Sequence, residues 1–309
     1  GGDLYTQAYD DGTPHQLALT DTERGVLDFA KKNCDGVVVV LNSCNTMQVG
    51  ELEDDPNIDA VITMCTPGAV GFKSLGKILN GSVNPSGRLV DTFATDFTAA
   101  PSYKNFGDNL SDGGNQYMLG GSGSGYYYVE YEEGICVGYR YYETKAYDEA
   151  DFGNDDWYKE NVVYPFGYGL SYTTFDWKIA DSTDNSVDLT ADGEIQVQVK
   201  VTNTGSVAGK DVVQLYVSLP YTDYDKEHGV EKAAIQLLDY GKTAELAPGA
   251  SETVTITADM QNMASWDSTA DNAAGTKGCY ILDAGDYWFT IGNGAHEAVN
   301  NVLAAEGQS

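Results

Sequence analysis

Positively charged residues are scarce in this chain of 309 amino acids. Seventeen lysines and arginines stand against 47 aspartates and glutamates, which leaves a formal net charge of −30 and an isoelectric point near 4.1. Such a surface repels phosphate backbones and anionic lipid head groups, so nucleic-acid binding is disfavoured. The balance suits a neutral ligand such as a sugar, although solubility accounts for the larger share of it.

Regular patterns of metal-binding and disulfide-forming residues are missing as well. The five cysteines include no CxxC pair, and an odd number in a chain of this size favours thiols that are buried or without a role over a disulfide scaffold. The three histidines, His15, His228 and His296, lie far apart in the sequence. This spacing argues against a histidine-based metal site.

Long apolar runs are also absent. No segment approaches the ~20 apolar residues that a membrane-spanning helix needs, so we expect no membrane span. The first residues carry neither the basic start nor the apolar core of a signal peptide. Because the chain begins on Gly1 rather than methionine, we expect a fragment or a processed product. The compartment stays open, with an extracellular or cell-surface location favoured over a cytoplasmic one.

From about residue 20 to residue 95, helix and strand signals alternate. Thr20 and Glu23 have the spacing of a capping box, in which the hydroxyl accepts a backbone N–H and the carboxylate reaches back to the cap. Residues 37–41, VVVVL, form an apolar run without polar interruption. A strand that is apolar on both faces is typical of the middle of a parallel sheet covered by helices.

A second strand and a second helix follow in the same region. Residues 58–64 are the candidate strand, and an apolar stripe over 72–79 predicts a helix that Gly81 closes. Strand and helix alternating at these lengths predict an open, mostly parallel α/β sandwich domain. We assign residues 1–175 to this domain, since the length of the chain favours two domains.

One stretch of the first domain has a different composition. Residues 103–127 are rich in Gly, Ser, Asn and Asp and lead into three consecutive tyrosines at 126–128. They predict a long surface loop or insertion, with a functional role and a flexible insertion left as equal alternatives. Residues 130–175 then form a junction segment to the second domain.

After residue 175 the helical signals stop, and short strands separated by turns follow. Residues 195–201, IQVQVKV, alternate apolar and polar side chains as a half-exposed strand must. Further strand candidates are 212–217, 253–257 and 285–292, with turns at 203–205 and 246–249. These features predict a β-sandwich over residues 176–297, followed by a tail or linker over 298–309.

A set of short motifs carries a resemblance to a known family. In chain order they are NPSGRL at 84–89 with TF at 92–93, EGICVGYRYY at 133–142, YPFGYGLSYTTF at 164–175, VTNTG at 201–205, VVQLYV at 212–217, LAPG at 246–249 and AGDY at 284–287. Together they resemble the second α/β domain and the fibronectin type III-like sandwich of family 3 glycoside hydrolases of the β-glucosidase type.

These motifs also have structural interpretations. Their glycines and Pro165 allow tight turns, and their aromatic side chains can fill a seam between domains. Arg140 is expected to be a structural fork to a carboxylate or to carbonyl groups rather than a substrate ligand. The motifs therefore identify the family without carrying its reaction.

The resemblance implies a retaining β-glycosidase. The expected enzyme is a β-glucosidase that hydrolyses β-linked gluco-oligosaccharides through a covalent glycosyl-enzyme, without metal or organic cofactor. This chain would form one wall of the active site. A β-xylosidase of the same family and a non-catalytic carbohydrate-binding or structural module are the alternatives.

The catalytic residues implied by the resemblance lie outside this chain. The nucleophile is an Asp on a (β/α)8 barrel, for which the chain is too short and shows no eightfold repetition. We expect this barrel as a partner, in the same protein or in another chain, before or after the present region. The family's acid/base Glu precedes a Gly-x-Asp sequence that Gly1, Gly2 and Asp3 match. The resemblance thus implies that this Glu lies immediately before Gly1.

Five residues are candidates for the neighbourhood of the substrate. On the same alignment Gly2, Asp3 and Tyr5 would border the pocket of the leaving-group sugar. Asn42 and Ser43 end the first predicted strand, and ligands of open α/β sheets lie at the carboxyl ends of strands. Ordinary loop packing is the competing interpretation for Asn42 and Ser43.

Two other groups of carboxylates call for an interpretation. An acidic run at residues 51–55 lacks the spacing of a calcium loop and is better explained as a solvated loop. Glu132 and Glu133 are adjacent, so on a strand their side chains would point to opposite faces. Neither is assigned a catalytic role.

Overall fold

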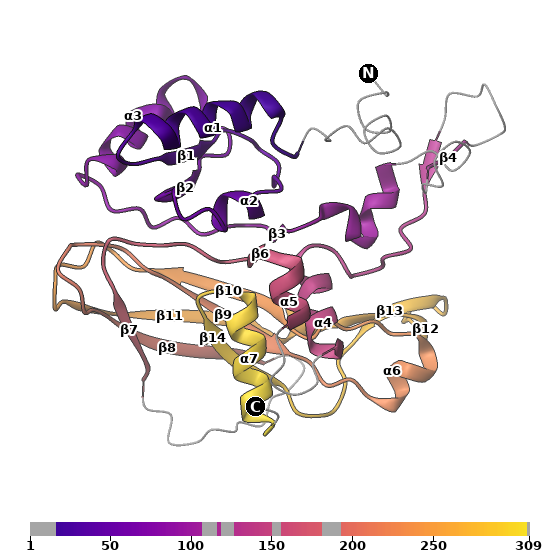
Figure 1. The fold of residues 1–309 in the computed structure, drawn as a ribbon. Coiled ribbons are helices and arrows are strands. Elements are labelled where there is room, and N and C mark those ends of the chain that lie inside the picture. The colour runs from indigo at the N-terminus through magenta and orange to yellow at the C-terminus, as the bar shows by residue number, and fades with distance from the viewer. Residues whose placement is uncertain (1–16, 107–115, 119–126, 150–155, 181–192, 308–309) are drawn as a thin grey trace. The chain divides into compact units, whose positions relative to one another are not determined.

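The computed structural model describes residues 17–106, 116–118, 127–149, 156–180 and 193–307 (Figure 1). The chain divides into two compact units. The first comprises residues 1–72, 91–142 and 156–164, and the second comprises residues 73–90, 143–155 and 165–309. The second unit thus adds two earlier segments to the sandwich region. The domain boundaries at 175 and 297 stay predictions.

The first unit begins its described part with a capped helix and a small parallel sheet. Helix α1 (Asp21–Asn33) starts at the predicted capping box, in which Glu23 N donates to the Thr20 hydroxyl and Thr20 N donates to the Glu23 carboxylate over 2.7 Å. Strand β1 (Val38–Leu41) pairs in parallel with β2 (Ala60–Thr63). The helix–strand alternation predicted for this region is confirmed, and the class is α/β.

The prediction that β1 is buried on both faces is wrong for the described residues. Only Leu41 is buried in this strand, and Val38 is exposed. The two long helices of the region, α1 and α3 (Gly68–Leu79), contain no buried residue. The physical reason is that the described sheet has just two strands, too few for helices to enclose either face fully.

Further short elements belong to the first unit, and one of them, the helix Tyr139–Glu149, continues into the second unit after residue 142. They are α2 (Gly50–Glu53), β3 (Phe93–Ala94), 3-10 helices at Phe97–Ala99 and Pro101–Phe106, β4 (Gln116–Met118), β5 (Tyr127–Val129), α4 (Tyr139–Glu149), α5 (Asp156–Asn161) and β6 (Val162–Tyr164). Strand β3 pairs with β6, and β4 pairs with β5, both antiparallel. The predicted loop at 103–127 therefore contains part of a 3-10 helix and a β-pairing, with Tyr117 stacked on Tyr128. Its residues 107–115 and 119–126 lie outside the described part.

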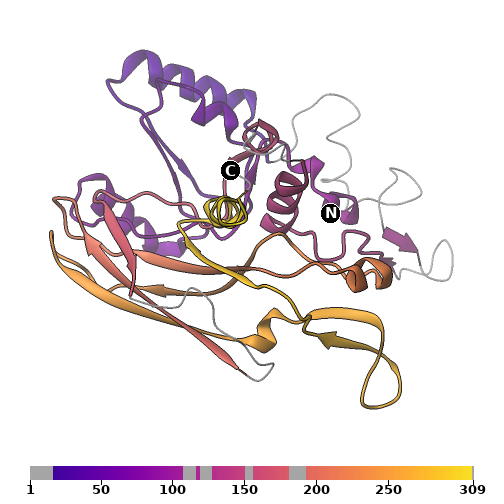
Figure 2. The ribbon, with the colours of Figure 1, turned by 90° about the horizontal axis from the view of Figure 1, so that it is seen from below.

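The second unit is built on a β-sandwich of two antiparallel sheets (Figures 1 and 2). One sheet contains β7 (Phe175–Ile179), β8 (Glu194–Asn203) and β11 (Ser251–Asp259), and the other contains β9 (Val212–Ser218), β10 (Gln236–Lys242) and β14 (Trp288–Gly292). Strand β8 follows the predicted alternation, and Val199 and Val201 on its inner face are fully buried. They join Val213 and Leu215 of β9 in one hydrophobic core.

Five further elements belong to the second unit. A 3-10 helix at Met260–Met263 precedes a hairpin of β12 (Ser265–Asp271) and β13 (Lys277–Ile281). Helix α6 (Asp223–His228) contacts β12 of this hairpin. Helix α7 (Ala295–Ala305) packs against β14. We expected a tail or linker from residue 298 onward, whereas the structure has a helix there through residue 305. The reason is visible in its pattern, because Ala298, Val299 and Val302 recur at helical spacing and are buried.

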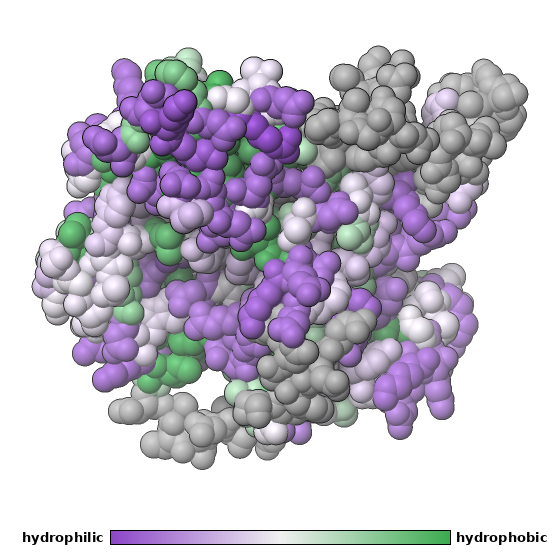
Figure 3. Space-filling view, in the orientation of Figure 1, coloured by the Kyte–Doolittle hydropathy of each residue, from purple (hydrophilic) through white to green (hydrophobic). Residues whose placement is uncertain are grey.

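Within the described residues, no helix is long and apolar enough to span a bilayer. The face shown in Figure 3 is largely hydrophilic, with apolar patches near its upper edge over the region of α1 and α3.

Candidate functional site

The carboxyl edge of the β1–β2 sheet carries the polar residues suspected from the sequence. Asn42 follows the buried Leu41 and is exposed, and Ser43 is half-buried. The parallel register places Leu41 beside Thr63, and Met64 N donates to Leu41 O over 2.9 Å. Both strands therefore deliver their following loops to the same edge of the sheet.

The Ser43 side chain is engaged within its own loop. Its Oγ accepts from Asn45 N over 3.2 Å and donates to Asn45 O over 3.0 Å. The Asn42 side chain, by contrast, has no hydrogen bond in the described structure. On the opposite loop, Cys65 is exposed and has a left-handed backbone with φ of 50°. A non-glycine residue in this conformation is uncommon and is enriched at functional sites.

The other substrate-proximal candidates cannot be placed on this edge. Gly2, Asp3 and Tyr5 lie outside the described residues. Their position near a sugar pocket stays a prediction, and so does that of Asn42 and Ser43.

The acidic run after β1 has structural partners. Arg24 forms a paired hydrogen bond to Glu51, and the Tyr164 hydroxyl bonds Glu53. Lys31 Nζ lies 2.8 Å from the carboxylate of Asp55, and this bond, with further bonds from Asn57, lowers the pKa of Asp55 to about 2. Residues 50–53 are helical rather than a loop, but these carboxylates remain structural charges on the surface.

Two carboxylates in the first unit, Glu133 and Asp91, had no sequence signal that singled them out. Glu133 is 8% exposed, and Asn105 Nδ2 donates to its Oε1 over 2.6 Å. Its Oε2 has no hydrogen-bond partner among the described residues. Glu132 is exposed, so the adjacent pair does point in different directions, although on a turn rather than a strand. Asp91 is exposed as a residue, but desolvation of its carboxylate by neighbouring atoms raises its pKa, and this carboxylate accepts the backbone N–H of Thr92. Sequence patterns missed these two because the surroundings of a single acid leave no periodic trace.

The NPSGRL segment and the aromatic junction segment interlock within the second unit. Leu89 N donates to Tyr168 O over 2.8 Å, and Gly167 N donates to Leu89 O over 2.9 Å. Asn84 Oδ1 accepts from the Ser171 hydroxyl and from Tyr172 N. A side chain at Gly169 would collide with the backbone carbonyl of residue 87. The glycine is needed for this close approach.

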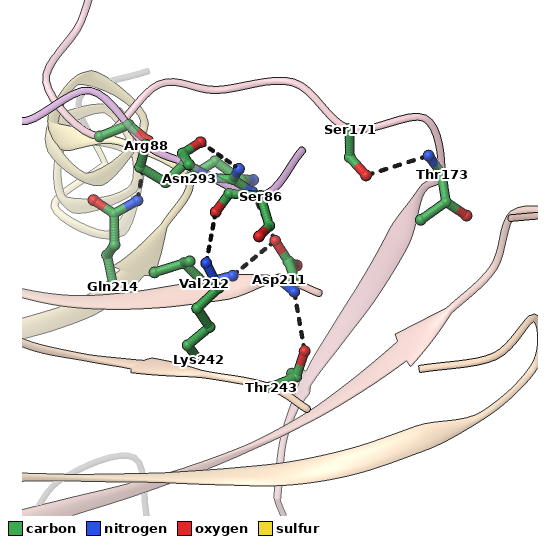
Figure 4. A network of polar contacts seen from close by, with 12 residues as sticks. Ser86, Arg88, Ser171, Thr173, Asp211, Val212, Gln214, Lys242, Thr243 and Asn293 are labelled. Carbon is green, nitrogen blue, oxygen red and sulfur yellow. Dashed lines mark hydrogen bonds and ion pairs between the residues drawn. The ribbon is translucent and has the colours of Figure 1, made fainter. Parts of the chain in front are cut away.

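The same segment is anchored on the sandwich through Asp211, at the start of β9 (Figure 4). Arg88 Nη2 donates to Asp211 Oδ1 over 2.7 Å, and Trp177 Nε1 donates to Asp211 Oδ2 over 2.7 Å. Lys242 Nζ donates to Ser86 O over 2.9 Å. Both members of the Arg88–Asp211 ion pair are largely buried. These motif residues hold the fold together, and none of them offers a reactive group to a substrate.

Arg140 does not form the expected fork. Its side chain is half-buried at the start of α4, and within the described structure it has no hydrogen bond or ion pair. Also among the described residues, no group of three His, Cys, Asp or Glu side chains is arranged to hold a metal ion.

Comparison with known proteins assigns these two regions. Residues 5–139 match the glycosyl hydrolase family 3 C-terminal domain, and residues 211–295 match the fibronectin type III-like domain. The chain belongs to glycosyl hydrolase family 3 through these domains. Asn42 and Ser43 lie within the part that matches the C-terminal domain, and the Asp211 anchor begins the part that matches the fibronectin type III-like domain.

Relatives of this family 3 chain align over most of its length. It is 36% identical to beta-glucosidase A of Butyrivibrio fibrisolvens over 289 residues, which are 90% of this chain and 30% of that protein. It is 34% identical to a beta-glucosidase of Ruminococcus albus, over 91% of this chain and 25% of that protein.

Solved structures of beta-glucosidases also align with most of this chain. A beta-glucosidase from Paenibacillus barengoltzii superposes with a TM-score of 0.70 at 35% identity, over 90% of this chain and 26% of that one. Beta-glucosidase 3B from Thermotoga neapolitana superposes with a TM-score of 0.68 at 26% identity, over 91% and 33%. The chain thus spans between a quarter and a third of the length of these relatives.

Proposed function

We propose that this chain is part of a retaining β-glucosidase that hydrolyses β-linked gluco-oligosaccharides. The observation that carries the proposal is the 36% identity to a beta-glucosidase across 90% of the chain. The continuity of this match through both domains supports a shared role in one enzyme. A match confined to the sandwich would have supported a mere spacer equally well.

In this proposal the chain forms one wall of the active site. Retaining glycosidases need two carboxyl groups about 5–5.5 Å apart, one as nucleophile and one as acid/base. We assign the nucleophile Asp to a (β/α)8 barrel, in the same protein or another chain, and the acid/base Glu to the position immediately before Gly1. Double displacement between these two groups requires no metal and no organic cofactor.

The carboxyl edge of β1–β2 is the part of the described wall that would face sugar. Asn42 has an exposed amide that can both donate to and accept from a hydroxyl group. Ser43 would hold the loop in shape through its two bonds to Asn45. Gly2, Asp3 and Tyr5 would line the same pocket from the segment that precedes α1.

The first test is turnover by the 309-residue chain alone. It should not hydrolyse an aryl β-glucoside, because the nucleophile is supplied by the barrel. Turnover by the purified chain that a mechanism-based sugar inhibitor abolishes would show that both carboxyl groups are present here, and would overturn the assignment.

The second test is a chimera in which this chain replaces the matching 289 residues of Butyrivibrio fibrisolvens beta-glucosidase A. The chimera should hydrolyse aryl β-glucosides in preference to aryl β-xylosides. The reverse preference would support a β-xylosidase instead. A folded chimera without either activity would support a non-catalytic module.

Within an active chimera, Asn42→Ala should raise KM for an oligosaccharide by about tenfold, the usual size for one lost hydrogen bond to a bound ligand. Asn33→Ala is the matched control. Asn33 is also exposed and ends α1, before β1 begins, so it lies away from the carboxyl edge. Equal KM values for the two variants would show that Asn42 does not contact the substrate.

A further inference from the structure

The β12–β13 hairpin presents two aromatic side chains to solvent. Trp266 and Tyr280 are directly opposite each other in the antiparallel register, so they lie on the same face of the hairpin. Their ring centroids are 5.1 Å apart with an interplanar angle of 69°. Trp266 is 51% exposed and Tyr280 is 71% exposed. In both views of the fold the hairpin extends away from the two sheets of the sandwich (Figures 1 and 2).

Asp267, the residue after Trp266, anchors strand β12 through hydrogen bonds. Asp267 is fully buried, and its carboxylate accepts the Tyr224 hydroxyl over 2.6 Å. It also accepts the backbone N–H and hydroxyl of Thr269 and the backbone N–H of Ala270. Because side chains alternate along a strand, burying Asp267 forces Trp266 to the outer face.

The far end of the hairpin is equally well defined. The Asn272 side chain donates to Thr276 Oγ1 and to Gly278 O, and accepts from Ala274 N and Thr276 N. Gly278 has φ of 96°, and a Cβ placed there would lie 2.6 Å from the indole of Trp266. The indole therefore rests on a bare stretch of backbone, which fixes its position.

Leaving two fixed aromatic rings in water has a thermodynamic cost that burial would remove. Stability of the hairpin does not require this exposure, because Asp267, Asn272 and Gly278 hold the hairpin without the outer face. A pyranose ring has a face of C–H groups that is apolar and slightly positive, and an aromatic ring has a negative face. Rigid aromatic rings also lose little conformational entropy when they bind.

We propose that Trp266 and Tyr280 form a binding platform for a neutral β-linked glucan chain. The charge of the protein favours this occupant. With a net charge of −30, the chain repels anionic polysaccharides and repels a second copy of itself. The exposed charges beside the platform, Asp271 and Lys277, are paired with each other over 2.7 Å.

The size of the platform also fits a glycan better than a protein. Two aromatic side chains bury ~150–250 Å² each. A stable protein interface needs about 800 Å² from each partner. The preference for a β-linked glucan rests on the proposed β-glucosidase function, whereas the preference for a neutral glycan rests on the platform itself.

The test is affinity electrophoresis of the 309-residue chain in native gels that contain a soluble polysaccharide. Hydroxyethyl cellulose, which is neutral and β-linked, should retard the chain. Carboxymethyl cellulose, which is anionic, and soluble starch, which is α-linked, should retard it less. No catalysis is needed for this measurement, so its result is independent of the tests of hydrolysis.

Variants assign the retardation to the platform. Trp266→Ala and Tyr280→Ala should each weaken binding at least about tenfold, as truncation of an aromatic hot spot does. Trp266→Phe should keep part of the binding and shows that the strand is intact. Tyr240→Ala, which removes an equally exposed tyrosine from β10, is the matched control and should bind as the parent does.

Several outcomes would overturn the proposal. One is equal retardation of the Trp266→Ala variant and the parent. Another is no retardation of the parent in any neutral polysaccharide. A third is a dimer, seen by light scattering, that Trp266→Ala converts to a monomer. Equal binding to starch and hydroxyethyl cellulose would leave the platform standing and overturn the β-glucan assignment, whatever the hydrolysis tests show.

Discussion

The sandwich buries its apolar side chains, whereas helix α1 of the α/β unit exposes them. In the sandwich, Val201, Val213 and Leu215 are enclosed between two sheets. In the α/β unit, helix α1 buries no residue, and its Val26 and Phe29 are 64% and 69% exposed. The sandwich supplies its own core, whereas the described α/β unit leaves an apolar surface uncovered. Such a surface is typical of a region that packs against another domain, which agrees with the proposed barrel partner.

The largest expected effect concerns the ion pair that ties the NPSGRL segment to the sandwich. Arg88→Met leaves the Asp211 carboxylate buried without its cation and should lower the free energy of unfolding by ~3–5 kcal/mol. The double variant Arg88→Met, Asp211→Asn removes the unpaired charge and should recover part of the loss. Urea unfolding followed by circular dichroism measures both. A loss below ~1 kcal/mol for the single variant would show that the anchor adds little to the sandwich unit.

The comparison itself is tested by matched truncations in the two regions. Leu215→Ala opens a cavity in the sandwich core and should cost ~2–5 kcal/mol. Phe29→Ala removes an exposed ring from α1 and should change stability by no more than ~0.5 kcal/mol. In the chimera with a barrel, Phe29→Ala should become costly if the partner covers α1. Equal effects of the two truncations in the isolated chain would refute the contrast.

A smaller effect is expected at the start of α1, where local bonds rather than burial give stability. Thr20→Ala removes the hydroxyl of the capping box and should cost about 1 kcal/mol. Ser268→Ala, at an exposed position of β12, is the control and should be neutral. Hydrogen exchange of the first-turn amides of α1 is the measurement. Unchanged exchange in Thr20→Ala would show that the capping box does not stabilise the helix.

The smallest effect is the contribution of one carboxylate of the α/β unit, Asp55, to the acid dependence of stability. Lys31 and Asn57 hold the pKa of Asp55 at about 2, below its usual value of 3.8. A carboxylate with a lowered folded-state pKa stabilises the fold above its unfolded-state pKa, and this contribution is lost as the pH falls from about 4 to about 2. Asp55→Asn should make the loss of stability over this interval shallower. The same slope in the parent and the variant would contradict the assignment.

Much of the fold could be predicted because local chemistry decides it. Thr20 and Glu23 form their capping box through neighbouring atoms, and Gly81 has the positive φ that ends a helix. The alternation of residues 195–201 reports which face of β8 is buried. The run of valines before Leu41 led to the wrong prediction that both faces of β1 are buried. An apolar run shows that a strand can be buried, but other parts of the fold decide whether it is covered.

The candidate site could be predicted only in outline. The carboxyl edge at Asn42 and Ser43 follows from the rule for open sheets, but the loop bonds of Ser43 to Asn45 do not. Among the residues that the structure describes, the Oε2 atom of Glu133 and the side chain of Arg140 have no partner, and this depends on how distant segments pack. A sequence pattern carries no signal for a contact that is absent.

The sequence by itself determined the two classes of domain, the positions of caps and turns, and the family, since each of these is written in residues close together along the chain. The tertiary structure alone decided that Asp211 would meet both Arg88 and Trp177, and that Asp267 would be buried while Trp266 faces water. Arg88 lies 123 positions before Asp211, and no local rule acts over that distance. Such contacts depend on the packing of the whole fold. An unpaired buried charge is strongly destabilising, so the fold must place a partner beside it, however distant that partner is in the sequence.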